Sequence, residues 1–350
     1  MNAQRILVIR RDNIGDLILT TPLIRALRQR FPKEWIGGLL NSYNARVLEA
    51  NTDLDEVFVY TKAKHRGSAS VWSAYWSTIS LILRLRKLRV DYAILASPAA
   101  SAKAQMFARR IKARNIVGFG DDASPKFALQ ASTAGVLHEV EEAFRIAAFF
   151  GIEGAPPKTA VYVDARKASE ARELIVNALP GKGALIGVHI SARKPPQRWP
   201  AESFVELLRQ LAEHRPDVAF VLFWSPGESN NPTHPGDDDK ARQILERLGS
   251  FPVVPFPTHT LSDLFAGLAV CDWIICSDGG AMHAAAALGK PILCFFGNSD
   301  ARRWHPWGVP YQLLQAQSED VSDITVAMAI EKFQELQKGA RSLEQAKIPA

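Results

Sequence analysis

The stretch CDWIICSDGGAMHAAAALGKPILCFFGNSD, residues 271–300, predicts a strand–turn–helix–strand unit. Residues 273–276 and 292–296 are short apolar runs of the kind that buried strands have. Between them, a glycine-containing turn at 277–280 precedes an alanine-rich helix at 281–288. This order of elements is typical of an α/β fold with a parallel sheet.

The turn at 277–280 is a candidate anion site. The first N–H groups of a helix have no partner within the helix, and they attract phosphate groups. The alternative is an ordinary unit in which Gly279 and Gly280 only permit tight packing. Asp278 and His283 favour the ligand site, because they put a carboxylate and an imidazole at the carboxyl edge of the sheet, where α/β proteins bind ligands.

Length and composition indicate a globular protein of two domains. The chain has 350 residues, of which 47% are hydrophobic and 22% charged. We expect a cytoplasmic protein, because the sequence has neither a membrane-spanning apolar run nor a signal-peptide pattern at its start. The cysteines lie in apolar, strand-like positions without metal-binding spacing, and we expect them to be small core residues: Cys271, Cys276 and Cys294.

Positive charge is concentrated in the first part of the chain. Residues 1–150 contain 22 Lys and Arg against 13 Asp and Glu, a net charge of +9, so the total of +6 leaves −3 for residues 151–350. A basic first half suits an anionic acceptor, a nucleic acid or an anionic membrane face. It is also compatible with an ordinary solvated surface.

The start of the chain predicts a second strand–turn–helix unit, with a strand at 5–10 and a helix at 17–31. The turn between them has Gly15 but lacks the G-x-G-x-x-G pattern, which argues against a dinucleotide site. Asp16 lies at the start of the helix. It is either a helix cap or, at the carboxyl edge of the first strand, a general base.

Strands and helices alternate on both sides of a Gly- and Pro-rich linker at 151–159. The fold class we expect is α/β, with two Rossmann-like doubly wound domains facing a cleft, at 1–155 and 156–350. We place a closing helix at 321–338, which would pack back on the first domain. A helix at 71–89 has an apolar stripe and a basic end, so it is either an ordinary packed helix or a membrane-surface helix. The stripe comprises Trp72, Trp76, Ile79 and Leu83, and the basic end comprises Arg84, Arg86, Lys87 and Arg89.

The loop SARKPPQRWP, residues 191–200, carries three cations, Arg193, Lys194 and Arg198. Its prolines restrict the backbone, so the cations suit an anion such as a diphosphate. The alternative is a solvated basic loop. Asp237, Asp238 and Asp239 resemble a Mg²⁺ site, but they open a helix, and we interpret them as helix-start residues rather than metal ligands.

Three blocks of the sequence resemble glycosyltransferase family 9, the bacterial heptosyltransferases of lipopolysaccharide assembly. These blocks are ILVIRRDNIGDLILTTPLIRAL, HISARKPPQRWPAESF and SDGGAMHAAAALGKPILCFFGNSDARRWHPWG. The resemblance implies two Rossmann-like domains in the GT-B arrangement. It also implies transfer of a sugar from a nucleotide sugar to a lipid-linked or glycan acceptor, with inversion and without a required metal or other cofactor.

The resemblance assigns roles to individual residues. Asp16 matches the family's proposed base, and we assign Arg10, Arg11 and Asn13 beside it to the acceptor side. The donor-binding turn, with its amides on the diphosphate and its carboxylate on sugar hydroxyls, matches Asp278, Gly279, Gly280 and His283. On the donor side we add Ser191, Arg193, Lys194 and Arg198, and Glu228 as the match for a family glutamate. Gln197 stands where the family commonly has lysine, and either Arg198 or Lys194 would then supply the charge.

The leading hypothesis is an inverting glycosyltransferase with ADP-heptose as donor and a lipopolysaccharide-core or similar anionic glycan as acceptor. It would work in the cytoplasm, in peripheral contact with the inner membrane and without a nucleic-acid partner. The alternatives are a nucleotide-sugar epimerase of the same fold and a non-catalytic nucleotide- or glycan-binding protein. The missing glycine pattern disfavours an NAD dehydrogenase.

Overall fold

A computed structural model describes residues 4–60, 71–98, 101–119, 127–129, 135–179, 181, 183–231 and 235–345; at 71–75, 127–129 and 341–345 it describes the backbone alone. The chain divides into two compact units, Met1–Tyr162 and Val163–Ala350. We expected a boundary after residue 155. Residues 156–162 belong with the first unit, because the Ala160 N–H donates to Thr21 Oγ1 at 3.0 Å and the Arg25 guanidinium donates to the Tyr162 hydroxyl at 2.8 Å.

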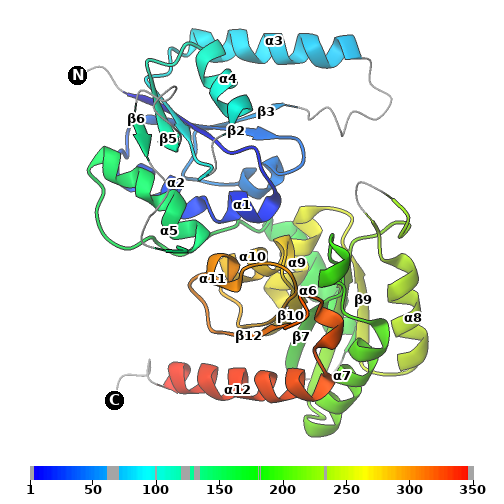
Figure 1. Cartoon of the computed structure of the whole chain (residues 1–350). Coiled ribbons are helices and arrows are strands. Elements are labelled where there is room, and N and C mark those ends of the chain that lie inside the picture. Colours follow the sequence, from blue (N-terminus) through cyan, green and yellow to red (C-terminus); the bar gives the residue numbers. More distant parts are fainter. Residues whose placement is uncertain are drawn as a thin grey trace. The chain divides into compact units, whose positions relative to one another are not determined.

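The first unit is a six-stranded parallel sheet with helices on both faces (Figure 1). The strand order is β3-β2-β1-β4-β5-β6, so the chain reverses direction across the sheet between β1 and β4. The elements are β1 (Arg5–Ile9), α1 (Ile14–Ile18), α2 (Thr21–Arg30), β2 (Trp35–Asn41), η1 (Ala45–Leu48), β3 (Glu56–Tyr60), α3 (Val71–Lys87), β4 (Tyr92–Leu95), α4 (Ala102–Arg110), β5 (Asn115–Phe119), β6 (Phe127–Leu129), α5 (Glu139–Phe144) and η3 (Arg145–Phe150).

The second unit repeats this design with the order β12-β11-β10-β7-β8-β9, and its chain reversal lies between β7 and β10. Its elements are α6 (Ala165–Ala178), β7 (Ala184–His189), η4 (Pro195–Gln197), α7 (Ala201–His214), β8 (Val218–Trp224), α8 (Asp238–Leu248), β9 (Val253–Pro257), α9 (Leu261–Val270), β10 (Trp273–Ser277), α10 (Gly280–Ala287), β11 (Ile292–Phe296), α11 (Ala301–Trp304), β12 (Tyr311–Gln315), η5 (Val321–Asp323) and α12 (Val326–Gln345). The expected fold of two Rossmann-like parallel α/β sheets is confirmed.

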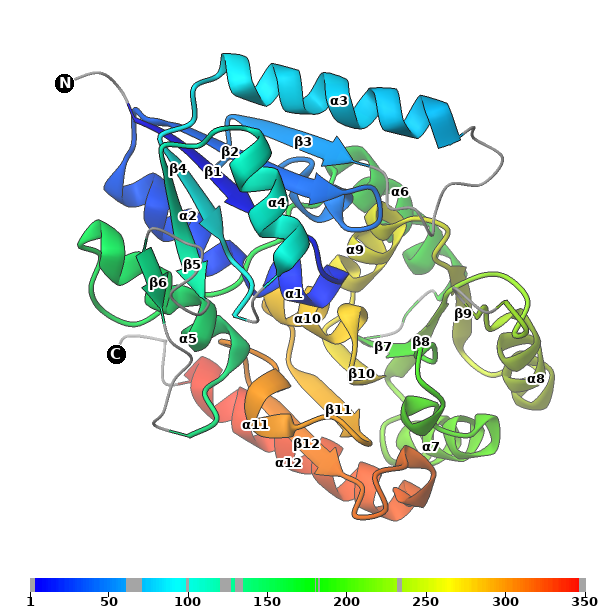
Figure 2. The ribbon, with the colours of Figure 1, turned by 45° about the horizontal axis from the view of Figure 1, so that its top comes forward.

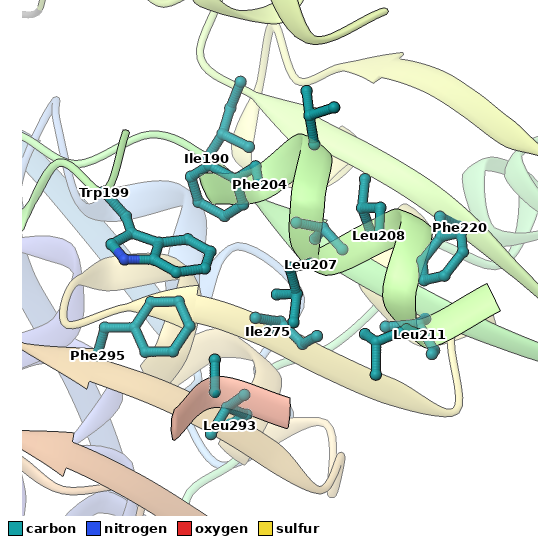
Figure 3. Packing of buried hydrophobic residues seen from close by; sticks show 14 of the residues in the cluster. Ile190, Trp199, Phe204, Leu207, Leu208, Leu211, Phe220, Ile275, Leu293 and Phe295 are labelled. Carbon is teal, nitrogen blue, oxygen red and sulfur yellow. The ribbon is translucent and has the colours of Figure 1, made fainter. Parts of the chain in front are cut away.

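The core of the second unit lies between its sheet and the helices α7, α8 and α12. Figure 3 shows Trp199 between Phe204 and Phe295, with ring centroids 4.9 and 4.7 Å away. The three cysteines are buried and unpaired, as the sequence predicted. Burial raises the pKa of each thiol, which keeps them as apolar core groups.

Several expected helices have different limits. The helix expected at 17–31 is two helices, because α1 ends at Ile18 and α2 starts at Thr21 with Pro22 in its first turn, where proline is tolerated. After β2 the chain forms only the short 3₁₀ turn η1, and the helix α5 continues as 3₁₀ from Arg145. The closing helix starts at Val326, later than expected, and packs on β11, β12 and α7; its packing on the first domain stays a prediction.

Within the described residues, no helix combines the length and apolar character needed to cross a membrane.

Candidate functional site

The first candidate site is the loop after β1, beside the reversal point between β1 and β4, where doubly wound sheets bind ligands. Asp16 is the third residue of α1, and its Oδ2 accepts the backbone N–H of Asn13 at 2.8 Å and the Asn13 side-chain amide at 2.9 Å. Its Oδ1 accepts from Arg10 at 3.1 Å. The carboxylate therefore has a helix-capping role and is fixed in orientation. A carboxylate has about four acceptor positions, so these three bonds leave capacity for a further donor.

Arg10 is the group that fixes Asp16. Its side chain is only 1% exposed and faces three carboxylates: Asp16, Glu139 at 2.8 Å and Asp12 at 3.1 Å. It also donates to the carbonyl of Ala96 on the neighbouring strand's loop. Burial would lower the pKa of Arg10, but the three carboxylates outweigh burial and the pKa is raised.

The Arg10 guanidinium, which the sequence placed on the acceptor side, is buried and engaged by three carboxylates, so it orients Asp16. Its contact with an acceptor stays a prediction. Arg11 is partly exposed; it donates to the Tyr60 hydroxyl and lies 4.7 Å from the Tyr60 ring centre. Asn13 is exposed. Arg11 and Asn13 therefore stay predictions on the acceptor side.

Two buried asparagines that the sequence analysis missed support this loop from β2. The Asn41 amide donates to the carbonyls of Arg11 and Asp12 at 2.9 and 3.3 Å, and Asn44 donates to Asp12 at 3.4 Å. Both side chains are fully buried. The signal available was a pair of amides, NSYN, directly after a strand, where buried polar groups have to find partners.

The second candidate site is the turn between β10 and α10, beside the reversal point between β7 and β10. Gly279 is the N-cap of α10 and has an extended backbone (φ 160°, ψ −171°). This backbone conformation does not require a glycine. A Cβ at Gly279 would meet no atom of the described residues within 4 Å. The helix α10 has small side chains and is buried, and Ala284 and Ala285 have no exposed surface. The turn thus presents the first N–H groups of an eight-residue helix without a side-chain cap.

Asp278 and Gln197 are brought together by this turn and the loop after β7. Gln197 is 5% exposed, and its amide donates to Asp278 Oδ2 and to Ser299 Oγ, each at 2.8 Å. The residue at the family's lysine position is therefore a neutral bridge that orients the carboxylate. Gly297 permits this packing, because a Cβ there would lie 2.3 Å from the carbonyl oxygen of Pro196.

His283 lies on the same helix, one turn after Gly279. It is 4% exposed, and its ring packs edge-on toward Trp304 of α11 with centroids 6.4 Å apart. The structure thus places His283 close behind the turn.

The cations of the loop 191–200 differ in how far they are exposed. Arg193 and Lys194 are exposed. Arg198 pairs with the buried carboxylate of Asp237 and donates to the carbonyl of Ala192 at 3.2 Å. Ser191 Oγ accepts the Ser225 N–H at 2.9 Å, which ties the loop to β8. Arg198 therefore holds the loop in place, and the donor-side roles of Arg193 and Lys194 stay predictions.

Lys240, which the sequence analysis missed, lies in the same cluster. It donates to the Ile190 carbonyl at 3.1 Å, and its ammonium lies 5.0 Å from the Phe204 ring centre. Burial, the largest effect, lowers the pKa of Lys240 to about 8; Arg198 also lowers it, while Asp237 raises it. Lys240 holds the carboxyl end of β7 against α8.

The three consecutive aspartates 237–239 have different partners. Asp237 pairs with Arg198, Asp238 accepts from Trp224 Nε1 at 2.7 Å and from the Gly227 N–H at 2.9 Å, and Asp239 pairs with Arg242. Asp238 and Asp239 form the first turn of α8, as expected of helix-start residues. No group of three or more His, Cys, Asp or Glu in the described part of the chain is arranged to hold a metal. The Glu228 side chain is exposed, so its donor role stays a prediction.

Comparison with known proteins gives a family match: the model for glycosyltransferase family 9 (heptosyltransferase) matches residues 78–330. Lipopolysaccharide heptosyltransferase 3 of Escherichia coli is 24% identical over 301 residues, covering 84% of this chain and 82% of that protein. Lipooligosaccharide heptosyltransferase 2 of Haemophilus influenzae is 26% identical over 176 residues, which cover 45% of this chain and 49% of the relative. The chain therefore matches about half the length of that second relative.

Solved structures share the fold at low sequence identity. A glycosyl transferase family 9 protein from Veillonella parvula has a TM-score of 0.82 at 20% identity, covering 96% of this chain and 98% of that one. The E. coli ADP-heptose lps heptosyltransferase II has a TM-score of 0.76 at 20% identity, covering 97% of this chain and 100% of that one.

Proposed function

This chain belongs to glycosyltransferase family 9 and is a glycosyltransferase, and we propose that it moves heptose from ADP-heptose, with inversion, to an anionic glycan of the lipopolysaccharide core. The heptose and the acceptor class are suggested by the names of its relatives, and ADP by the E. coli heptosyltransferase II of the same fold.

The observation that carries the proposal is the open start of α10. Gly279 is demanded neither by its backbone conformation nor by neighbouring atoms of the described residues, which favours a role in the close approach of a ligand. The N–H groups of the first helical turn would bind the diphosphate of the donor. As the sugar–phosphate bond breaks, negative charge grows on that diphosphate, and fixed N–H donors stabilise it without reorganisation.

Asp16 is the proposed general base. In our mechanism an acceptor hydroxyl gives its proton to Asp16 while its oxygen bonds to the anomeric carbon and the ADP leaves from the opposite face. Arg10 keeps Asp16 oriented for this transfer. A positioned base typically contributes ~10²–10⁴-fold to the rate.

Asp278 is the proposed ligand of the sugar hydroxyls. Its carboxylate is oriented by a hydrogen bond from the Gln197 amide. Because that amide is uncharged, it does not neutralise the negative charge of Asp278. A neutral amide at this position favours a donor sugar recognised through hydroxyl groups over one recognised through an acidic group. Arg193 and Lys194 would add charge for the diphosphate.

The acceptor is proposed to be anionic because the half that carries Asp16 has a net charge of +9. Attraction between exposed charges is screened over ~8 Å at physiological salt, so the acceptor KM is expected to rise with ionic strength more than the donor KM does. We place the reaction in the cytoplasm, at the face of the inner membrane.

The test is incubation of the purified chain with a panel of ADP- and UDP-sugars, with and without a delipidated lipopolysaccharide core. We expect the acceptor to gain a heptose with inverted anomeric configuration, read by mass spectrometry and NMR, from ADP-heptose alone. A donor changed in the absence of acceptor would indicate an epimerase. Transfer from UDP-sugars with none from ADP-heptose would overturn the donor assignment.

A further inference from the structure

We propose that α3 and α4 together form a docking surface for an anionic phospholipid bilayer. This proposal deepens the proposed function, because it names the surface on which the enzyme would meet a membrane-bound acceptor. The two helices cover the same face of the first sheet and share one core cluster (Figure 2). They are joined at their ends by a 2.6 Å hydrogen bond from Arg86 to the carbonyl of Arg110.

The basic charge of the first unit is concentrated in this layer. Between residues 71 and 114 a single acidic residue, Asp91, stands against a set of cations: Arg84, Arg86, Lys87, Arg89, Lys103, Arg109, Arg110, Lys112 and Arg114. Each of these cations is exposed. Among the described residues, Arg84 pairs with Glu56 and Arg114 pairs with Asp91. By sequence, the nine cations and one carboxylate of 71–114 leave a net charge of +8. The layer is therefore strongly electropositive.

The outward face of α3 is apolar at its centre. Ile82 and Leu85 point into the core, whereas Trp76 and Leu83 are 65% and 50% exposed. Trp76, Leu83 and Lys87 follow a spacing of seven and four residues, so they lie along one face of the helix, with Arg84 and Arg86 on either side of it. On α4, Met106 is exposed between Lys103 and Arg110 on one face.

An indole and leucine bordered by cations fit the interface of an anionic bilayer. Tryptophan prefers the headgroup level, and long cationic side chains reach up to the phosphates while their stems stay with the apolar groups. A nucleic acid would use the cations but would gain little from Leu83 or Met106.

The ends of the two helices give a second, independent observation. Arg89 after α3 and Lys112 after α4 have left-handed backbones, with φ of 49° and 58°. Glycine is the usual residue at such a helix end, because a side chain is strained there. Both positions are occupied by exposed cations, so the chain keeps charge on this surface where glycine would fit the backbone better.

The experiment is co-sedimentation of the full chain with vesicles that contain about one-third phosphatidylglycerol, or phosphatidylcholine alone, without donor or acceptor. We expect binding to the anionic vesicles only, weakened by salt. Lys87→Glu with Lys103→Glu should reduce the partition coefficient at least about tenfold, since each cation near such a surface contributes about fivefold. Trp76→Ser should reduce it several-fold at every salt concentration.

The matched control is Lys33→Glu with Lys158→Glu, which changes the charge of the same unit equally at exposed positions outside the two helices. It should stay within about twofold of wild type. Equal losses in the two double variants, or equal binding to phosphatidylcholine, would overturn the proposal. Tighter binding to a short DNA duplex, unaffected by Trp76→Ser, would assign the surface to nucleic acid and also overturn it.

Arg89→Gly with Lys112→Gly separates docking from folding. This variant should bind anionic vesicles less tightly without a lower melting temperature, and a parallel loss of both would contradict the proposal. Transfer to a delipidated soluble acceptor is measured on the same samples. Vesicle binding without transfer would refute the proposed function alone, and transfer without vesicle binding would refute the docking surface alone.

Discussion

The helix that follows β1 and the helix that follows β10 begin in opposite ways. At α1 the carboxylate of Asp16 accepts hydrogen bonds from the Asn13 N–H and from the Arg10 guanidinium. At α10 the cap is Gly279, which has no side chain to do this. The same strand–turn–helix unit, beside the reversal point of the same kind of sheet, thus yields a fixed carboxylate in one unit and uncapped N–H donors in the other. A few residues at the helix start decide which chemistry the unit can support.

The strongest test of the first helix start is Asp16→Asn. We expect turnover to fall by ~10²–10⁴-fold, because the amide cannot accept the acceptor's proton, while ADP affinity stays close to wild type. Steady-state kinetics and calorimetric titration with ADP measure the two effects. The control is Asp12→Asn, which removes another carboxylate beside Arg10 but a more exposed one. A comparable rate loss in that control would show that charge near Arg10, rather than the base, is what matters.

The next test removes the Arg10 guanidinium, which donates to Asp16. Arg10→Met leaves Asp16 and Glu139 as buried carboxylates without their cation, and breaking a buried ion pair in this way costs about 3–5 kcal/mol. We expect this loss in the free energy of unfolding measured with urea. Glu139→Gln, which keeps Arg10 paired with Asp12 and Asp16, should cost clearly less. A loss below about 1 kcal/mol for Arg10→Met would mean that the ion cluster is not structural.

A pair of glycine variants tests the second helix start. Gly279→Ala should lower ADP affinity at least about tenfold, or ~1.4 kcal/mol, and leave stability unchanged, because its methyl group enters the ligand's space and strains no backbone. Gly289 follows the other end of α10 and has φ +76°, so Gly289→Ala should lower the free energy of unfolding by about 1 kcal/mol. The ADP affinity of this variant should stay unchanged. If both variants affect only stability, the open turn is a packing feature.

The smallest expected effect concerns Lys240. Its pKa of about 8 lies below the usual value of 10.5, so between these pH values the unfolded chain binds more protons than the folded chain. Stability should therefore rise with pH across that window, by about 1 kcal/mol once solvent screening is allowed for. The difference in unfolding free energy between wild type and Lys240→Met, at pH 8 and pH 10, isolates this contribution. A flat difference would mean that Lys240 keeps its ordinary pKa.

The buried parallel strands could be predicted from sequence because both of their faces are covered, so they read as unbroken apolar runs, as in VAFVLFW of β8. The strands β9 and β12, which the sequence analysis missed, lie at the edges of the second sheet. VVPFP carries two prolines and YQLLQ is half polar, which edge positions tolerate. Helix α6 was missed because only Ala171 and Ile175 of its residues are buried.

The residues of the candidate site that directly follow strands could be predicted from the sequence. Asp16, Gly279 and Asp278 follow strands directly, and position along the chain is enough to place them. The partners of these residues come from distant parts of the chain: Glu139 is 129 residues from Arg10, and Gln197 is 81 residues from Asp278. The burial of Arg10 could not be predicted for this reason, since its sequence neighbours do not reveal it.

The indole of Trp199 connects the loop after β7 to the segment between η5 and α12. Its Nε1 donates to the carbonyl of Ile324 at 2.9 Å, across 125 residues, and its ring packs on Phe204 and Phe295 (Figure 3). During synthesis on a ribosome, the loop that carries Arg193, Lys194 and Gln197 is made long before Ile324 emerges. The nascent chain can form its first sheet early, but this loop gains the Trp199–Ile324 anchor only after Ile324 has emerged. The loop is therefore expected to reach its final conformation later than the first sheet does.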